Sequence, residues 1–165
     1  MELSLYRVRK KQTIGESVFK SLLTGLNAAE RKEAVQGMVR FWKSPLGQEI
    51  RRSPKCYPEL PFIYKTPYGL LKGQIDLVYQ KSPGHWVILD YKTNQIAKNQ
   101  VEKAAEEYEF QLGLYSLVFG DLTGEIPAQG ALYFMSPNET HSFNYTPAAI
   151  KAIRERLLAV FQTIV

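Results

Sequence analysis

The sequence has almost no cysteine and no long apolar run. Cys56 is the only cysteine in 165 residues, which excludes an internal disulfide, a Cys₄ zinc site and a cysteine-held iron–sulfur cluster. No stretch approaches the roughly 20 apolar residues of a membrane-spanning helix. The first residues carry Arg7, Arg9, Lys10 and Lys11 where a secretory signal would have an apolar segment. We therefore expect a cytoplasmic protein.

A phosphate-binding loop is also missing. The chain contains no Gly-x-x-x-x-Gly-Lys-Ser/Thr pattern, so we expect no ATP site. The remaining composition is ordinary, with 45% hydrophobic and 22% charged residues, as in globular proteins. The length predicts a single domain over 1–165.

Basic charge is concentrated at the start of the chain. Residues 1–55 hold twelve basic and five acidic side chains, whereas 56–165 hold nine and eleven. A local charge of +7 favours a polyanionic partner such as nucleic acid or acidic lipid, and the alternative is a solvated helical surface. A peripheral membrane protein ranks last, because the basic residues form no stripe opposite Trp and Phe.

Residues 1–55 are expected to form a basic helical segment. Apolar residues at helical spacing over 14–23 predict one helix. Asn27, with Glu30 three residues later, predicts a capping box for a second helix, which should stop near Ser44-Pro45. Ser44, with Pro45 at the first helical position, predicts the start of a third, short helix.

Residues 56–145 are expected to form the sheet core. Short runs of aliphatic and aromatic residues lie between turn signals at 67–69 and 81–84. Gly120 should end a long amphipathic helix. The alternation predicts an α/β or α+β domain with helices on a mixed sheet of about five strands. The expected strands are 60–64, 71–80, 85–92, 131–135 and 142–145, and the expected helices are 99–119 and 147–165.

Two carboxylates interrupt apolar strands. Asp76 and Asp90 each lie in such a strand, and a buried carboxylate is costly unless it is paired or binds a metal. Lys92 follows Asp90 by two residues and shares its face of the strand, and the hairpin would bring Asp76 beside them. Glu59 could supply a third carboxylate. Such oxygen ligands suit Mg²⁺ or Mn²⁺ and predict phosphodiester hydrolysis. The alternative for Asp90 and Lys92 alone is a buried salt bridge.

A longer ordered set of residues surrounds these carboxylates. It consists of Glu59, Gly73-Gln74-Ile75-Asp76, Asp90-Tyr91-Lys92 and Tyr108-x-x-Gln111-x-x-x-Tyr115. This order resembles the RecB-type nucleases of the PD-(D/E)xK superfamily over roughly residues 13–120, with isoleucine where the superfamily name has proline. The resemblance implies a restriction-endonuclease-like α/β core.

The resemblance also implies a role for each residue of the set. Lys92 would assist the attacking water. Gln111 and Tyr115, four residues apart on one helix face, would support the site and the DNA backbone, together with Tyr108. Lys72, outside this set, is a further candidate for contact with DNA. The implied metal ligands are Asp76, Asp90, Glu59 and the backbone carbonyl of Tyr91.

One position departs from the family pattern. RecB-type nucleases often carry a metal-binding histidine in the first helix, and here Phe19 stands at that place. Glu16 is a candidate substitute, whereas His85 and His141 lie away from the motifs. The single cysteine separates this chain from the family members that hold an iron–sulfur cluster.

The expected function is that of a metal-dependent DNA exonuclease in recombination and repair. It would work with a helicase in the same chain or in a separate polypeptide, in the cytoplasm and on the nucleoid. The basic segment would contact the phosphate backbone, aided by Lys65 and Lys72. Because phosphates carry no sequence information, we expect DNA binding with little sequence specificity. The alternatives are a structure-specific or restriction-type endonuclease, and a non-catalytic module that binds DNA or a partner protein.

Overall fold

The computed structural model describes residue 25 and residues 27–164. The chain divides into two compact units, 1–36 and 37–165, with the boundary inside helix α2 (Ala28–Lys43). The helix expected over 14–23, with Glu16 and Phe19, lies outside the described residues. The single nuclease domain over 1–165 therefore stays a prediction.

The predicted starts of the second and third helices of 1–55 are confirmed. The N–H of Glu30 donates to Asn27 Oδ1 at 3.0 Å, and the N–H of Asn27 donates to Glu30 Oε2 at 2.7 Å, which completes a capping box for α2. Ser44 Oγ accepts from the N–H of Gly47 at 3.1 Å. This bond caps the short helix α3 (Pro45–Arg52), which has proline at its first position.

Five strands form one mixed sheet in the order β1-β2-β3-β4-β5, which confirms the predicted α/β class. Only β3 and β4 pair in parallel. The predicted limits of β3 are correct, whereas β1 and β2 are longer than expected and the last two strands begin earlier. The strands are β1 (Cys56–Thr66), β2 (Gly69–Ser82), β3 (His85–Lys92), β4 (Gln129–Phe134) and β5 (Glu139–Asn144).

The single helix predicted over 99–119 is wrong. The segment contains a 3₁₀ turn, η1 (Lys98–Gln100), and two helices, α4 (Val101–Glu106) and α5 (Glu109–Thr123), with Tyr108 between them. Gly120 is buried inside α5. The helix ends instead at Gly124, whose φ of 78° is the left-handed conformation that favours glycine. The predicted C-terminal helix is present as α6 (Pro147–Ile164).

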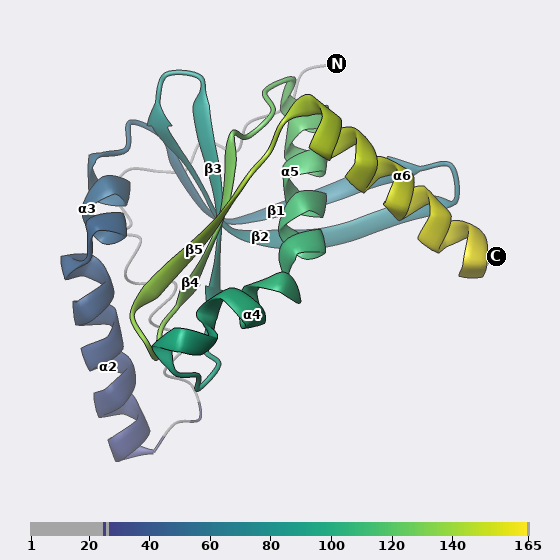
Figure 1. The fold of residues 1–165 in the computed structure, drawn as a ribbon. Coiled ribbons are helices and arrows are strands. Elements are labelled where there is room, and N and C mark those ends of the chain that lie inside the picture. The colour runs from purple at the N-terminus through teal and green to yellow at the C-terminus, as the bar shows by residue number, and fades with distance from the viewer. Residues whose placement is uncertain (1–24, 26, 165) are drawn as a thin grey trace. The chain divides into compact units, whose positions relative to one another are not determined.

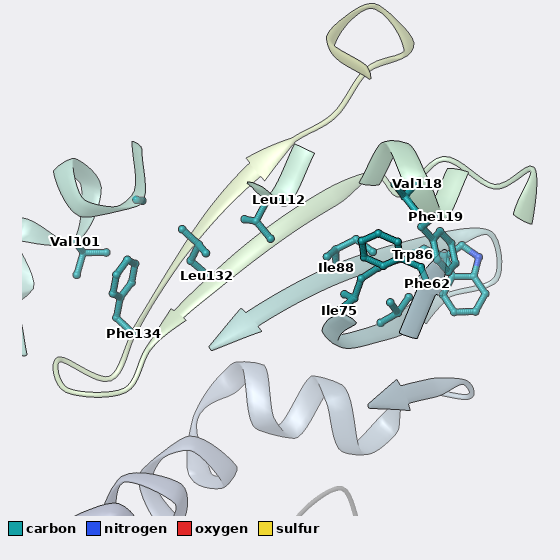
Figure 2. Close-up of a cluster of buried hydrophobic side chains, with 12 residues drawn as sticks. Phe62, Ile75, Trp86, Ile88, Val101, Leu112, Val118, Phe119, Leu132 and Phe134 are labelled. Carbon is teal, nitrogen blue, oxygen red and sulfur yellow. The ribbon is translucent and has the colours of Figure 1, made fainter. Parts of the chain in front are cut away.

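The main core lies between the sheet and helices α4 and α5. Ile75, Ile88 and Leu132 from the strands pack with Leu112 and Phe119 from α5 (Figure 2). On the opposite face, the hydroxyl of Tyr79 in β2 donates to Glu49 of α3 at 2.7 Å, and Figure 1 shows α3 and α5 on opposite sides of the sheet. No helix within the described ranges is long and apolar enough to cross a membrane.

The β1–β2 hairpin extends past the other strands, beneath α5 and α6 (Figure 1). The hydroxyl of Tyr64 donates to Asp121 of α5 at 2.5 Å and accepts from Arg154 of α6 at 3.0 Å. Arg154 also binds both carboxylate oxygens of Asp121, at 2.7 and 2.6 Å. One face of the hairpin is therefore fixed to two helices.

Candidate functional site

Asp76 and Asp90 come together where β2 and β3 stop pairing. The last pair of this antiparallel ladder is Leu77 with Leu89, so Asp76 and Asp90 are the next residues in the same register and share a face. The carboxylate Oδ2 of Asp76 accepts a hydrogen bond from the backbone N–H of Tyr91 at 3.0 Å. The Asp76 side chain thus takes the place of a ladder hydrogen bond at this end of the sheet.

Lys92 lies against Asp90, as the two-residue spacing predicts. Its Nζ is 2.8 Å from Asp90 Oδ2, and the two side chains are only 12% and 6% exposed. Nζ also donates to Gln111 Oε1 on α5 at 3.1 Å. The amide nitrogen of Gln111 in turn donates to the hydroxyl of Tyr115 at 2.9 Å. The predicted pair on α5 is therefore linked to the lysine.

Tyr108 covers the lysine from another side. Lys92 Nζ lies 3.6 Å from the centroid of the Tyr108 ring, a cation–π contact. The Tyr108 hydroxyl pairs with the side-chain amide of Asn94, at 3.2 Å to Nδ2 and 3.5 Å to Oδ1. These contacts explain the break between α4 and α5, because one continuous helix would carry Tyr108 away from Lys92 and Asn94. Asn94 is absent from the sequence-based prediction, and its only signal was its position two residues after Lys92.

The site raises the pKa of two of its groups. Burial raises the pKa of Asp90, the nearby Asp76 carboxylate adds to the effect, and the contact with Lys92 opposes it. Burial also raises the pKa of Tyr115, as do the charges of the two aspartates, while the hydrogen bond with Gln111 opposes this. Tyr115 therefore remains a neutral phenol beside the carboxylates of Asp76 and Asp90.

Tyr91 contributes only its backbone to this face. Its ring packs on the opposite side of the sheet, with its centroid 5.5 Å from that of Phe41 and 6.4 Å from that of Tyr133. The N–H and C=O of one strand residue point to the same edge, and the Tyr91 N–H points to Asp76. The Tyr91 carbonyl is thus expected on the edge of β3 that faces Asp76, and its role as a metal ligand stays a prediction.

Glu59 and Lys72 belong to the β1–β2 hairpin and take part in none of the contacts described above. The β1–β2 register places Pro58 opposite Leu77 and Leu60 opposite Ile75, so Glu59 lies opposite Asp76. Glu59 has a positive φ of 50° and is exposed, and within the described ranges no group of three acidic, histidine or cysteine side chains converges on one point. Lys72 is exposed on β2, four residues before Asp76.

The residues present fit a small, hard cation. Asp90 Oδ2 is buried and, among the described residues, makes no hydrogen bond beyond its ion pair with Lys92. Asp76, Asp90 and the carbonyl of Tyr91 offer oxygen atoms only. Mg²⁺ keeps several waters and is usually held by one or two carboxylates, and Asp76 and Asp90 supply two. Zinc sites usually include nitrogen or sulfur ligands, and this set contains none.

Known proteins are similar to this chain in sequence and in fold. The family model of the PD-(D/E)XK nuclease superfamily matches residues 5–165. The chain is 31% identical over 112 residues to an ATP-dependent helicase/nuclease subunit of Carboxydothermus hydrogenoformans, covering 60% of this chain and 10% of that protein. It is 29% identical over 153 residues to the protein of the same name from Clostridium perfringens, covering 79% and 12%. The chain thus spans about a tenth of the length of these relatives.

A solved structure has the same fold. A provisionally named exonuclease from Eubacterium rectale superposes with a TM-score of 0.52 at 14% identity, covering 92% of this chain and 67% of that one. An identity this low shows the fold alone. Since the family model matches almost the whole sequence, the chain belongs to the PD-(D/E)XK nuclease superfamily.

Proposed function

We propose that this chain is a divalent-metal-dependent DNA nuclease whose active centre is the meeting point of Asp76, Asp90 and Lys92. The observation that carries this proposal is the register of β2 and β3, which puts two carboxylates on one face beside a buried lysine. A purely structural salt bridge would need Asp90 and Lys92 only. It would give no reason for a second carboxylate close enough to raise the pKa of the first.

Each residue of the cluster has a distinct task in this proposal. Asp76, Asp90 and the Tyr91 carbonyl would hold Mg²⁺ or Mn²⁺, with Glu59 as a further ligand or a contact through water. When bound, the metal would polarise a phosphoryl oxygen and lower the pKa of a water. Lys92 would position that water and stabilise the negative charge that develops on the phosphate.

The residues on α5 would orient the lysine. Gln111 accepts from Lys92 and is itself held by the Tyr115 hydroxyl, so the ammonium is fixed between Asp90 and an uncharged amide. This arrangement keeps a flexible side chain in one conformation, and pre-organisation of this kind contributes to catalysis without reorganisation during the reaction.

The proposed reaction is exonucleolytic cleavage during recombination and repair, with a helicase in the same or another polypeptide. Its support is the similarity to proteins named helicase/nuclease subunits. The basic N-terminal segment and Lys72 would contact the phosphate backbone, which predicts binding that weakens steeply with salt. The cytoplasm, with its nucleoid, is the compartment where this activity would be needed.

The test compares two DNA substrates under three conditions. End-labelled linear DNA and a closed circular plasmid are incubated with the protein in Mg²⁺, Mn²⁺ or EDTA. Metal-dependent loss of the linear substrate alone supports the exonuclease, whereas nicking of the circle would replace it with an endonuclease. If the folded protein binds DNA but cleaves neither substrate, the proposal of a nuclease is contradicted. The alternative of a non-catalytic DNA-binding module would then replace it.

Asp90→Asn links the activity to the proposed centre. The amide keeps the shape of the side chain but removes the charge that would hold the metal, so cleavage should fall by orders of magnitude while DNA binding survives. Glu102→Gln is the matched control, because Glu102 is exposed on α4 and takes part in none of the contacts of the cluster. Cleavage by Asp90→Asn at the unmodified rate would show that the assignment of the centre is wrong.

A further inference from the structure

Strand β5 forms one edge of the sheet and pairs only with β4. Two backbone hydrogen bonds show which way its groups point. At the end of β4, the N–H of Met135 donates to the carbonyl of Lys92 in β3 at 2.9 Å, and just after β5 the N–H of Tyr145 donates to the carbonyl of Ala128 at 3.0 Å. Because backbone groups alternate between the two sides of a strand, both bonds indicate the same residues of β5 as turned away from β4.

Three residues of β5 turn their N–H and C=O outward: Thr140, Ser142 and Asn144. Among the residues that the structure describes, these backbone groups make no hydrogen bond, and the three side chains are exposed. Thr140 and Ser142 line a groove on the α3 face of the sheet. His141 and Phe143 point to the other face, where their ring centroids lie 4.8 Å apart. The outer edge of β5 is therefore a row of unused hydrogen-bond donors and acceptors.

The opposite edge of the sheet, β1, is protected against further pairing. Pro58 and Pro61 have no backbone N–H, Glu59 has a left-handed φ of 50°, and Lys65 is exposed on the strand. Prolines, an irregular backbone and edge lysines are features that prevent the addition of another strand. β5 contains no proline, no lysine and no residue with positive φ. Only the β5 edge is thus suited to pair with another strand.

The sequence of β5 is complementary to itself. When two copies of β5 run antiparallel about Ser142, this residue pairs with itself, and Thr140 pairs with Asn144 of the second copy. All three outward residues then form ladder hydrogen bonds, which any other register of the two strands would leave incomplete. On the other face, His141 lies opposite Phe143 of the second copy. Polar residues therefore meet polar residues, rings meet rings, and no like charges are opposed.

We propose that two copies of this chain associate through β5, so that their sheets join into one continuous sheet with a two-fold axis at Ser142. The proposed centre lies on β2 and β3, and β4 separates it from β5. The interface therefore contains none of its residues, and the proposal does not rest on the nuclease function. Two six-residue strands bury less than the roughly 1,200 Å² of a stable interface, so the dimer should be weak, with a Kd on the order of 10⁻⁵–10⁻⁴ M.

The test is sedimentation velocity of the full chain over concentrations that bracket this Kd. The unmodified chain should change from monomer to dimer as its concentration rises. Ser142→Lys and Ser142→Glu each put two like charges opposite one another on the axis, so each should weaken the dimer on the order of tenfold or more. An equimolar mixture of the two variants pairs a lysine with a glutamate and should restore the dimer.

Ser82→Lys and Ser82→Glu are the matched controls and should leave the dimer unchanged, because Ser82 is exposed on β2, which β3 and β4 separate from β5. An equal loss in these controls would show a general effect of charge and overturn the proposal. If the Ser142 variants stay folded in thermal unfolding but their mixture restores no dimer, the two-fold register is wrong. A chain that is monomeric at every concentration would also overturn the proposal and leave this edge to another polypeptide.

Amide hydrogen exchange of the unmodified chain, followed by NMR, is a second measurement that no folding defect can affect. The outward amides of Thr140, Ser142 and Asn144 should exchange quickly in dilute samples, because water reaches them. In concentrated samples their exchange should slow in proportion to the fraction of dimer, because each becomes bonded to the second copy. Exchange that does not depend on concentration at these three amides would refute the pairing.

Discussion

Removal of the Tyr108 ring should slow catalysis through Lys92. The lysine Nζ lies 3.6 Å from the ring centroid, and its side chain is only 12% exposed. A desolvated cation–π contact contributes about 2 kcal/mol, against about 0.5–1 kcal/mol at an exposed site. If that contact orients the ammonium during the reaction, Tyr108→Leu should lower kcat about 30-fold, since each 1.36 kcal/mol corresponds to a factor of ten.

The conservative variant separates the ring from its hydroxyl. Tyr108→Phe keeps the aromatic face over Lys92 and loses only the contacts with Asn94. These are long and exposed, so kcat should fall by a few-fold at most. Asn94→Ala should produce a loss of the same size, and the two changes combined should cost no more than one of them, because both remove the same interaction.

The assay is steady-state cleavage of linear DNA, with kcat and KM determined separately. A positioning role predicts that the loss lies in kcat, with KM nearly constant. Thermal unfolding of each variant identifies any loss that comes from a destabilised fold. The reasoning is refuted if Tyr108→Phe is as slow as Tyr108→Leu, because the ring would then have no role of its own.

Three further predictions concern other parts of the molecule. Lys92→Ala should lower cleavage by at least a hundredfold while oligonucleotide binding in EDTA stays normal, as binding and cleavage assays run side by side would show. Gly47→Ala should destabilise the fold by about 3 kcal/mol in urea titration, because a Cβ there would lie 2.2 Å from the backbone oxygen of Phe41. The hydrogen bonds of Arg154 lower the pKa of Asp121 below its ordinary 3.8, so their stabilisation is present at neutral pH and is lost as pH falls through the lowered pKa. The melting temperatures of the unmodified protein and Asp121→Asn should therefore differ at pH 7 and converge at the acid end, and a constant difference would contradict this.

Local signals in the sequence predicted the parts of the fold that depend on neighbouring residues. Asn27 and Glu30 form their capping box, and Ser44 caps α3, because each needs only residues within one turn. The limits of β3 were also predictable, since its apolar run lies between a turn and polar residues. Contacts between residues that are close in the sequence can therefore be predicted from the sequence pattern.

The break at Tyr108 was not predictable in this way. The apolar positions of 99–119 continue at helical spacing through it, and the sequence has no proline or glycine between Ala105 and Phe110. The chain departs from one helix where Tyr108 contacts Lys92 and Asn94, which belong to another part of the chain. A tertiary interaction has here overridden a local preference.

The candidate site was predictable in its parts but not in its assembly. The spacing of Asp90 and Lys92 fixed their common face, and the spacing of Gln111 and Tyr115 fixed theirs. Neither spacing indicated that Gln111 would accept a hydrogen bond from the lysine, nor that Asn94 would hold Tyr108. The place of Glu59 was equally hidden, because its left-handed φ of 50° interrupts a strand that the sequence marks as extended.

The pairing of Asp76 with Asp90 depends on an irregularity in β2. At the turn, Ser82 pairs with His85, and a regular ladder continued from that pair would put Asp76 opposite Tyr91. The register shifts between Gln80 and Ser82, so that Gln80 pairs with Trp86 and Leu77 with Leu89. Lys81 is the extra residue of this bulge.

A shift of one residue exchanges the two faces of a strand. Without the bulge, the Asp76 side chain would lie on the face opposite to Asp90, and the two carboxylates could not share a ligand. No turn signal at 81–84 distinguishes the two registers, because both fit the same Pro83-Gly84 turn. Lys81, the extra residue, also forms an ion pair with Glu49 of α3 at 2.7 Å. The proposed centre thus depends on one extra residue of β2, because that residue sets which face of the strand carries Asp76.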